Sequence, residues 1–236
     1  MRILVIAEHD GEVIRSGTRS AIGFANSVAE QTNGAVECLV LGHKISNVCH
    51  NAALNAVVLS ADYRALANPV ADRYAEVIAN VASQREPNLV VAAATTFARD
   101  IVGRAGGLLG GAMASDVVSH ELRDGQLVLR RPMFAGAVTA TVTLSGNPQI
   151  VTVRAAAYSA PKTAATPFEI TKVNIDESSL PSHIHFERVE SKQSHRPDVT
   201  EARVVVSGGR ALRNSDLGFP IWVVPGTAPN LNLALS

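Results

Sequence analysis

The chain has 236 residues, of which 47% are hydrophobic and 18% are charged, so its apolar content suffices for the core of one large domain, or of one domain with a smaller piece. Its 21 Lys and Arg residues balance 21 Asp and Glu residues. A formal net charge of zero creates no strong field toward nucleic acid or an anionic membrane. We therefore expect a protein or small-molecule partner, with no nucleic acid and no membrane insertion.

The sequence also predicts a compartment. It opens directly on an apolar strand pattern, without a basic and apolar export signal or an Arg- and Ser-rich transit segment. No apolar run reaches the roughly 18 residues that span a bilayer. Cys38 and Cys49 have neither a CxxC nor a repeated metal-ligand spacing, so we expect two reduced, buried thiols. These features together predict a cytoplasmic protein.

Short apolar runs alternate with helical patterns in the first hundred residues. Parallel strands that are covered on both faces require continuous rather than alternating apolarity. Four such runs are Ile3–Ile6, Ala35–Leu41, Ala56–Leu59 and Leu89–Ala93. Apolar residues at the helical spacing predict helices within 21–29, 70–81 and 97–109. The alternating order predicts right-handed crossovers and a doubly wound sheet.

Two of these helices have start signals. Asn68 is expected to cap the helix within 70–81, with Pro69 at a position that needs no amide donor. Thr95 and Thr96 are expected to cap the helix within 97–109, and at that sheet edge they could also meet a partner.

The pattern changes after about residue 115. Asp124-Gly125 is a turn signal between Val117–Leu122 and Leu127–Arg131, which predicts a hairpin. Apolar residues alternate with threonines over 138–144, which is typical of a half-exposed strand. Ile150–Val153 is expected to return beside that strand. We expect all of these as antiparallel additions at one edge of the sheet.

The remainder is polar at first and then strand-like. We expect a connector with edge strands at Phe168–Ile175 and His183–Glu190, followed by a new strand at Ala202–Val206. The expected domains are an α/β domain over 1–160, the connector over 161–200, and the start of a second α/β domain over 201–236.

A glycine turn follows the strand at Ala202–Val206. Gly208 and Gly209 would let the backbone approach a phosphate, and Arg210 could pair with its oxygens. The turn matches neither GxGxxG nor a P-loop. Taken alone, an ordinary strand-to-helix turn with a solvated arginine explains it more simply.

Three further groups of residues are weighed against ordinary structural roles. Glu8, His9 and Asp10 follow the first strand on the crevice side of an α/β sheet, where they form either a ligand site or a polar loop. His183 and His185 would share one face of a strand, but without a third ligand nearby they are interpreted as surface histidines. Asp100 and Arg104, four residues apart, predict a solvated ion pair on one helix.

Five stretches in a fixed order carry a family resemblance. They are ILVIAEHDGEVI, AAATTFARDIVGRAGGLLGGAMASDVV, RRPMFAGAVTATV, IVTVRAAAYSAP and ARVVVSGGRALR, which together span residues 1 to about 214. In sequence and order they resemble the electron transfer flavoprotein alpha subunit. The resemblance implies an α/β, doubly wound, mostly parallel sheet of the adenine nucleotide alpha hydrolase-like type, with antiparallel edge strands, followed by a fragment of a second, FAD-binding α/β domain.

The resemblance also implies function. Members of this family form a heterodimer with a beta subunit. The heterodimer uses one FAD to carry single electrons from flavin dehydrogenases, such as the acyl-CoA dehydrogenases of fatty acid oxidation, to a quinone reductase or similar acceptor. They are carriers rather than enzymes. The first domain packs against the partner. Ser207, Gly208, Gly209 and Arg210 match the cofactor-binding turn, whose arginine contacts FAD.

The final segment departs from the family. The GxSR, QxGxTG, SGAxQH, NKD and ADYG motifs expected after the glycine turn are replaced by LGFPIWVVPGTAPNLNLALS. We therefore interpret the chain as a truncated alpha subunit that binds FAD poorly by itself. Two alternatives stay open: a flavin-free interaction module that docks on a beta subunit, and a stand-alone adenine-nucleotide-binding domain.

Overall fold

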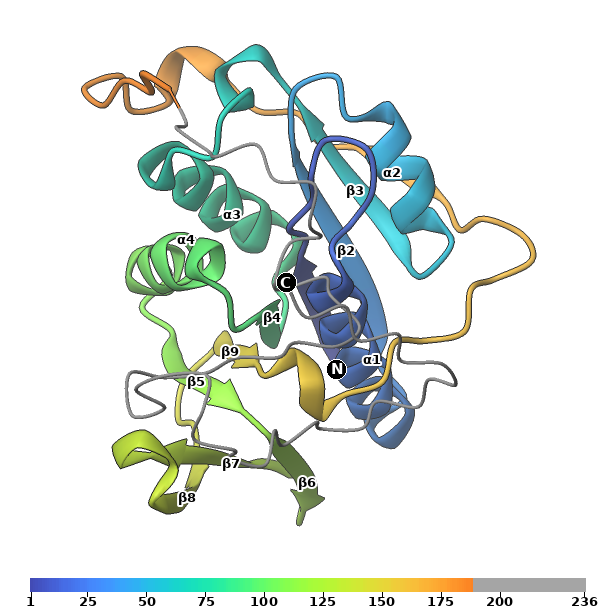
Figure 1. Cartoon of the computed structure of the whole chain (residues 1–236), viewed down its shortest axis with the longest axis vertical. Coiled ribbons are helices and arrows are strands. Elements are labelled where there is room, and N and C mark those ends of the chain that lie inside the picture. The colour runs from blue at the N-terminus through green and yellow to red at the C-terminus, as the bar shows by residue number, and fades with distance from the viewer. Residues whose placement is uncertain (189–236) are drawn as a thin grey trace, which may run out of the picture. The chain divides into compact units, whose positions relative to one another are not determined.

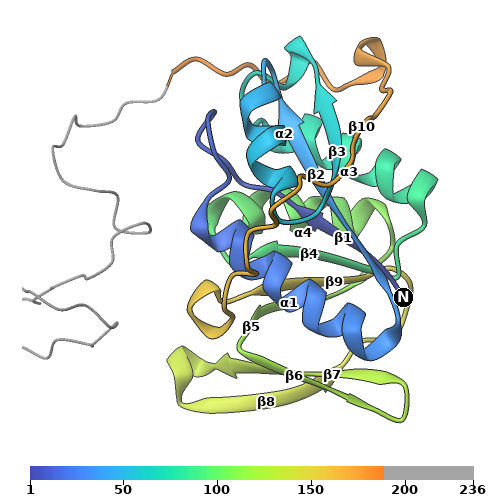
Figure 2. The same ribbon diagram turned by 90° about the vertical axis from the view of Figure 1, so that its right-hand side faces the viewer.

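The computed structural model describes residues 1–188, which form a seven-stranded sheet flanked by helices and a separate three-stranded sheet (Figures 1 and 2). The strand order of the large sheet is β10-β3-β2-β1-β4-β9-β5, and all of its pairings are parallel. Its strands are β1 (Arg2–Ile6), β2 (Ala35–Gly42), β3 (Val57–Asp62), β4 (Leu89–Ala93), β5 (Ala112–Val117), β9 (Gln149–Val153) and β10 (Ile170–Lys172). The four strands predicted in the first hundred residues are thereby confirmed.

Helices cover both faces of this sheet. They are α1 (Ser16–Thr32), α2 (Ser46–Ala53), α3 (Ala71–Arg85) and α4 (Thr96–Leu108). One core cluster joins α1 and α2 to Ile3 and Val5 of β1, and the other joins α3 and α4 to Leu4 and Ile6. Successive side chains of β1 thus enter opposite cores, which explains its continuous apolarity. The predicted doubly wound fold is confirmed, although α2 lacked a sequence signal that we recognised.

The two predicted helix starts had different outcomes. Thr95 caps α4, because its Oγ1 accepts a hydrogen bond from the amide of Ala98 at 3.2 Å, whereas Thr96 is already the first residue of the helix. The prediction for Asn68 was wrong: α3 begins at Ala71, with Val70 at the cap position and no capping side chain. Pro69 precedes this start, so the helix begins two residues later than its sequence signal suggested.

The small sheet has the order β6-β7-β8 and is antiparallel. Its strands are β6 (Ser119–Arg123), β7 (Gln126–Met133) and β8 (Val138–Thr143), and the hairpin predicted at Asp124-Gly125 is confirmed. It lies beside β5 (Figure 2) and contributes Leu127 and Leu129 to the core under α1. These strands therefore form a sheet of their own rather than extensions of the large one.

The expectation that Ile150–Val153 returns beside β8 was wrong. As part of β9, this segment lies between β4 and β5 and is parallel to both. Ile150, Val151 and Val153 are completely buried, so the same continuous apolarity that marks the other parallel strands explains the placement. Strand β5 escaped prediction because its sequence AMASDV mixes small and polar residues at an edge of the sheet.

The connector contributes one strand to the large sheet. Strand β10 lies within the predicted strand Phe168–Ile175 and pairs with β3 as an edge strand. The second predicted edge strand, His183–Glu190, is wrong for residues 183–188, which form no strand, and its last two residues lie outside the described ones. The predicted strand at Ala202–Val206 also lies outside them. Four short 3-10 turns complete the described chain: η1 (Arg64–Leu66), η2 (Phe134–Gly136), η3 (Ala155–Ala157) and η4 (Glu177–Ser179).

An aromatic cluster fastens the small sheet to α1. The ring of Phe24 packs edge-on against His120 of β6 and against Tyr158, with centroids 4.8 Å and 5.1 Å apart. The imidazole of His120 also lies 3.3 Å from Ser27 Oγ and 3.4 Å from the Tyr158 hydroxyl. Burial lowers the pKa of His120 and raises that of Tyr158 to about 12, so the cluster favours neutral rings.

Candidate functional site

The fold places a crevice at the carboxyl ends of the first strands. Strand β1 pairs with β2 on one side and with β4 on the other, so the chain changes direction across the sheet at β1. Ligands of open α/β sheets bind outside the carboxyl ends of the strands at such a switch point. A cavity of about 410 Å³ lies there, and its walls include the loop after β1, Gly42 at the end of β2 with His43 after it, and the rings of Tyr74 and Phe97.

The side chains of Glu8, His9 and Asp10 come together in this crevice, as the sequence predicted. Thr95 donates a hydrogen bond of 2.6 Å to Glu8 Oε2, which ties the end of β1 to the cap of α4. The amide of Glu8 donates to Thr18 Oγ1 of α1 at 2.9 Å. Glu8 therefore connects helices on both faces of the sheet.

His9 has both ring nitrogens engaged. Its Nε2 lies 2.9 Å from the carbonyl oxygen of Leu41, and its Nδ1 accepts from the amide of Gly11 at 3.1 Å. A carbonyl can only accept a hydrogen bond, so the proton must be on Nε2. His9 in this tautomer joins the loop after β1 to the end of β2.

The backbone amides from Asp10 to Ile14 all have hydrogen-bond partners within the domain. Asp10 Oδ1 accepts from the amides of Glu12 and Val13, each at 2.9 Å, and these hydrogen bonds, with Arg15 nearby, lower the pKa of Asp10. The amide of Ile14 donates to Asn51 Oδ1 and that of Asp10 to the Val13 carbonyl oxygen. Together with the bond from Gly11 to His9, every amide from Asp10 to Ile14 has a partner.

Polar groups in the far wall of the crevice also have hydrogen-bond partners. Tyr74 donates from its hydroxyl to the carbonyl oxygen of Leu66 at 2.9 Å, and burial raises its pKa. Its ring meets that of Phe97 edge-on at 6.2 Å. Asp62 accepts from the amides of Lys44 and Ile45, which lie just before α2. Tyr74 was predicted only as a helix core residue, and no sequence signal showed that it bounds a crevice.

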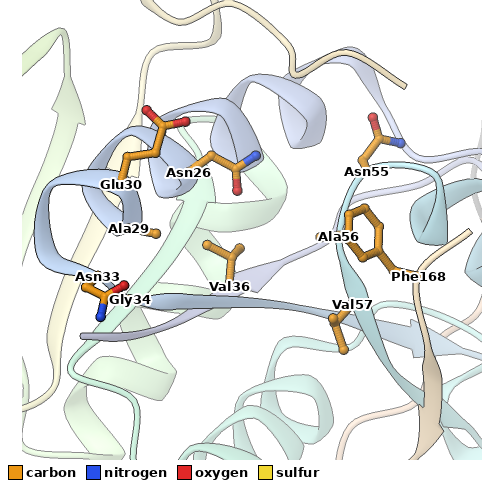
Figure 3. Close-up of a pocket in the computed structure, with 10 residues that line it drawn as sticks. All are labelled: Asn26, Ala29, Glu30, Asn33, Gly34, Val36, Asn55, Ala56, Val57 and Phe168. Carbon is orange, nitrogen blue, oxygen red and sulfur yellow. The ribbon is translucent and has the colours of Figure 1, made fainter. Parts of the chain in front are cut away.

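A second hollow of about 410 Å³ lies at the amino end of β2 and β3 (Figure 3). Its apolar lining includes Val36 and Ala56, and Asn26 of α1 points toward the space that Phe168 closes on the other side. Asn55, on the rim, donates to the carbonyl oxygen of Asn51 at 3.2 Å. Amide groups over an apolar lining can make polar contacts with a small ligand, and Glu30 of α1 adds a carboxylate to the lining.

The ion pair predicted between Asp100 and Arg104 was wrong. Arg104 instead reaches across to α3, where its guanidinium lies 3.1 Å from Asp72 Oδ1. His183 Nε2 lies 2.9 Å from the other oxygen of Asp72. Asp72 is buried, so it attracts partners more strongly than an exposed aspartate can.

The remaining predicted residues have structural roles or are not described. Within residues 1–188 no group of three or more His, Cys, Asp or Glu residues could hold a metal ion, and His183 is paired with Asp72. Cys38 and Cys49 are free and buried as predicted, and burial raises the pKa of the Cys38 thiol to about 12. The predicted cofactor turn lies outside the described residues; it consists of Ser207, Gly208, Gly209 and Arg210. None of the described helices is long and apolar enough to cross a membrane.

The parallel strand order, the helices on both faces and the crevice at the switch point define an open, doubly wound α/β domain. The model of the electron transfer flavoprotein domain matches residues 3–178, which are most of the described chain. The chain therefore belongs to the electron transfer flavoprotein family, and the resemblance found in its sequence is confirmed.

Characterised relatives agree with this assignment. The chain is 30% identical over 226 residues to the mitochondrial electron transfer flavoprotein subunit alpha of Oryza sativa subsp. indica, covering 90% of this chain and 62% of that protein. It is 31% identical over 219 residues to the alpha subunit of Pseudomonas aeruginosa, covering 92% and 67%. Protein FixB of Clostridium saccharobutylicum is 25% identical over 241 residues, covering 99% and 72%. The chain thus spans less than two thirds of the rice relative.

Proposed function

We propose that this chain acts as an electron transfer flavoprotein alpha subunit whose described domain docks on a beta subunit. The observation that carries the proposal is the agreement between the family match, residues 3–178, and the α/β domain that the described residues form. The assembled carrier would pass electrons from flavin dehydrogenases, such as acyl-CoA dehydrogenases, to a respiratory acceptor. FAD supplies the redox chemistry in such a carrier, and the protein supplies docking and orientation.

The described residues do not fit FAD themselves. A pyrophosphate needs free backbone amides at a turn or at a helix start. In the crevice, the amides from Asp10 to Ile14 are all engaged, and the carboxylates of Glu8 and Asp10 would repel a phosphate. The resemblance of Ser207, Gly208, Gly209 and Arg210 to the family's cofactor-binding turn supports these residues, rather than the crevice, as the flavin contacts of this chain.

The same observations favour a flavin-free docking module as the second candidate. A domain whose crevice is saturated by its own groups needs no cofactor in order to fold or to bind a partner. They disfavour a stand-alone adenine-nucleotide-binding domain, because every backbone amide from Asp10 to Ile14, in the loop after β1, is already engaged and cannot bind the phosphates of the nucleotide.

Co-expression with the beta subunit of the same organism tests these candidates. A purified complex with flavin absorbance that Arg210→Ala abolishes would support the carrier and the assignment of Arg210. A stable colourless complex would support the flavin-free module. Failure of the two chains to associate would overturn both, and a melting temperature that rises with AMP or ATP would support the nucleotide-binding domain instead.

A further inference from the structure

The hollow at the amino end of β2 and β3 lies where two helices end (Figure 3). Helix α1 ends at Thr32 and α2 at Ala53, each a few residues before one of these strands begins. The carboxyl end of a helix has a partial negative charge, because its last carbonyl groups lack intrahelical donors. At the end of α2 the connector supplies donors, from the amide of Ala164 to Leu54 and from that of Phe168 to Ala53. Among residues 1–188 the connector supplies none to the end of α1, so the negative end of α1 is the less compensated one.

The last turn of α1 adds to this negative charge. It contains no basic residue, whereas α3 ends with Arg85 in its last turn, where a cation is favourable. Glu30 places a carboxylate near the end of α1 instead, and it is the only charged side chain among those that line the hollow. Glu30 forms no ion pair with another residue of the described chain. The hollow therefore carries a negative charge that the described domain leaves uncompensated.

Polar side chains around the hollow also lack hydrogen-bond partners. Asn26, Glu30 and Asn33 line it from one side of α1, and within residues 1–188 their side chains form no hydrogen bond. Asn55 is 7% exposed and donates through Nδ2 to the carbonyl oxygen of Asn51, but nothing in the same part of the chain donates to its Oδ1. Amide and carboxylate oxygens at this hollow can thus accept hydrogen bonds from a ligand, unlike the polar groups of the crevice.

The rest of the lining includes apolar side chains. Val36 is half-buried near the start of β2, and Ala56 directly precedes β3. The ring of Phe168 is 46% exposed and closes the space opposite Asn26 (Figure 3). The volume of about 410 Å³ is within the range of small-molecule sites, about 300–1,000 Å³. One carboxylate is too few for a calcium or magnesium site, which needs several oxygen ligands, so these walls fit an organic ligand better.

We infer that this hollow binds a small organic cation, a primary ammonium group carried on a short apolar body. An ammonium group has three N–H donors and no acceptor, which matches the carboxylate of Glu30 and the amide oxygens of Asn26 and Asn33. The apolar body then lies between Val36 and the ring of Phe168. An anion is disfavoured, because Glu30 and the end of α1 both repel it. The inference goes beyond the function proposed above and does not depend on it.

The test measures binding of three probes of similar shape to the full-length chain by isothermal titration calorimetry at neutral pH. Phenethylammonium carries the proposed charge, 2-phenylethanol is its neutral counterpart and 3-phenylpropionate its anionic one. We expect saturable binding of phenethylammonium, and affinities weaker by about tenfold or more for the other two, because only the ammonium group makes charge-assisted hydrogen bonds. Hexylammonium, which has the same charge on an aliphatic body, should bind as well.

Variants locate the site. Glu30→Gln keeps the shape and removes the charge, so the affinity for phenethylammonium is expected to fall by about tenfold or more. The melting temperature should stay equal or rise, because a carboxylate near a helix carboxyl end is unfavourable. Glu86→Gln is the matched control: Glu86 follows α3 and pairs with Arg2, and its loss should change the affinity by less than about twofold.

Three outcomes would overturn the inference. The first is a chain that binds neither phenethylammonium nor hexylammonium. The second is equal binding of the cationic, neutral and anionic probes, which would show an apolar site without charge selection. The third is binding of phenethylammonium that Glu30→Gln leaves unchanged, which would place the cation elsewhere on the chain.

Discussion

The crevice and the turn between β7 and β8 differ in whether their polar groups have hydrogen-bond partners and their apolar groups are buried. In the crevice, His9, Asp10 and Tyr74 are all paired with groups of the same domain. At the turn, Arg131 keeps a buried donor without an acceptor, and Phe134 stays exposed on a strained backbone. The position that open α/β folds commonly use for ligands is thus occupied by structural hydrogen bonds. The small sheet lies at the periphery of the fold. Its unpaired Arg131 Nε and its exposed Phe134 are groups that a bound molecule can pair or cover.

Tyr74→Phe is expected to have the largest effect on stability, about 1–3 kcal/mol of unfolding free energy, because the buried carbonyl oxygen of Leu66 loses its donor. Urea denaturation measures the difference. Tyr63→Phe is a useful comparison, since its hydroxyl donates to the Val173 carbonyl oxygen at 2.9 Å in a more exposed place. If Tyr74→Phe lowers the unfolding free energy by less than about 0.5 kcal/mol, the hydrogen bond from Tyr74 to the Leu66 carbonyl oxygen does not contribute to stability as described.

Thr95→Val is expected to cost about 1–2 kcal/mol, because it removes both the cap of α4 and the donor to Glu8. Thermal or urea unfolding checks this value. Thr96→Val is the matched control: Thr96 is exposed, and its side chain has no capping role. Equal losses in the two variants would contradict the role of Thr95 as the link between β1 and α4.

Phe134→Gly is expected to act in the opposite direction and to stabilise the chain by about 0.5–1 kcal/mol, because glycine accepts the positive φ angle that phenylalanine resists. The gain is reduced by the greater freedom of glycine in the unfolded chain. A clear loss of stability would show that the exposed ring contributes to the fold, and it would weaken the contrast between the two regions.

The smallest effect concerns pH at the aromatic cluster. Burial lowers the pKa of His120 in the folded chain below its ordinary value of 6.5, while its neighbours Ser27, Phe24 and Tyr158 bring no charge. The unfolded state therefore binds the proton more readily, so this contribution to stability is complete above about pH 6.5 and decreases as the pH falls below it. Unfolding of the wild type and of His120→Phe between pH 5 and pH 7.5 should show a smaller pH dependence in the variant. Equal slopes would exclude His120 as the source.

Continuous apolarity predicted the buried strands, and its success in β1 and β4 comes from burial on both faces. The same signal in Ile150–Val153 was assigned to the wrong neighbour, because a sequence does not state which gap in a sheet a late strand will fill. The polar crevice residues were located correctly from the end of β1. The hydrogen-bond partners of His9 and Glu8 were not predictable, since Leu41 and Thr95 are distant from them in sequence. The unpaired Nε of Arg131 likewise has no sequence signature.

The insertion of β9 between β4 and β5 has a consequence for synthesis. When the ribosome has completed β4, its outer edge has no partner, and β5 follows without being able to fill that place. Only after the whole small sheet has been made does β9 arrive to join both strands, and β10 covers the opposite edge at β3 later still. Both edges of the nascent sheet thus stay unpaired until the late segments are synthesised, and during that interval they can pair with other chains. Ribosome-bound chains that end before Gln149 should therefore aggregate or recruit chaperones more readily than those that extend beyond Lys172.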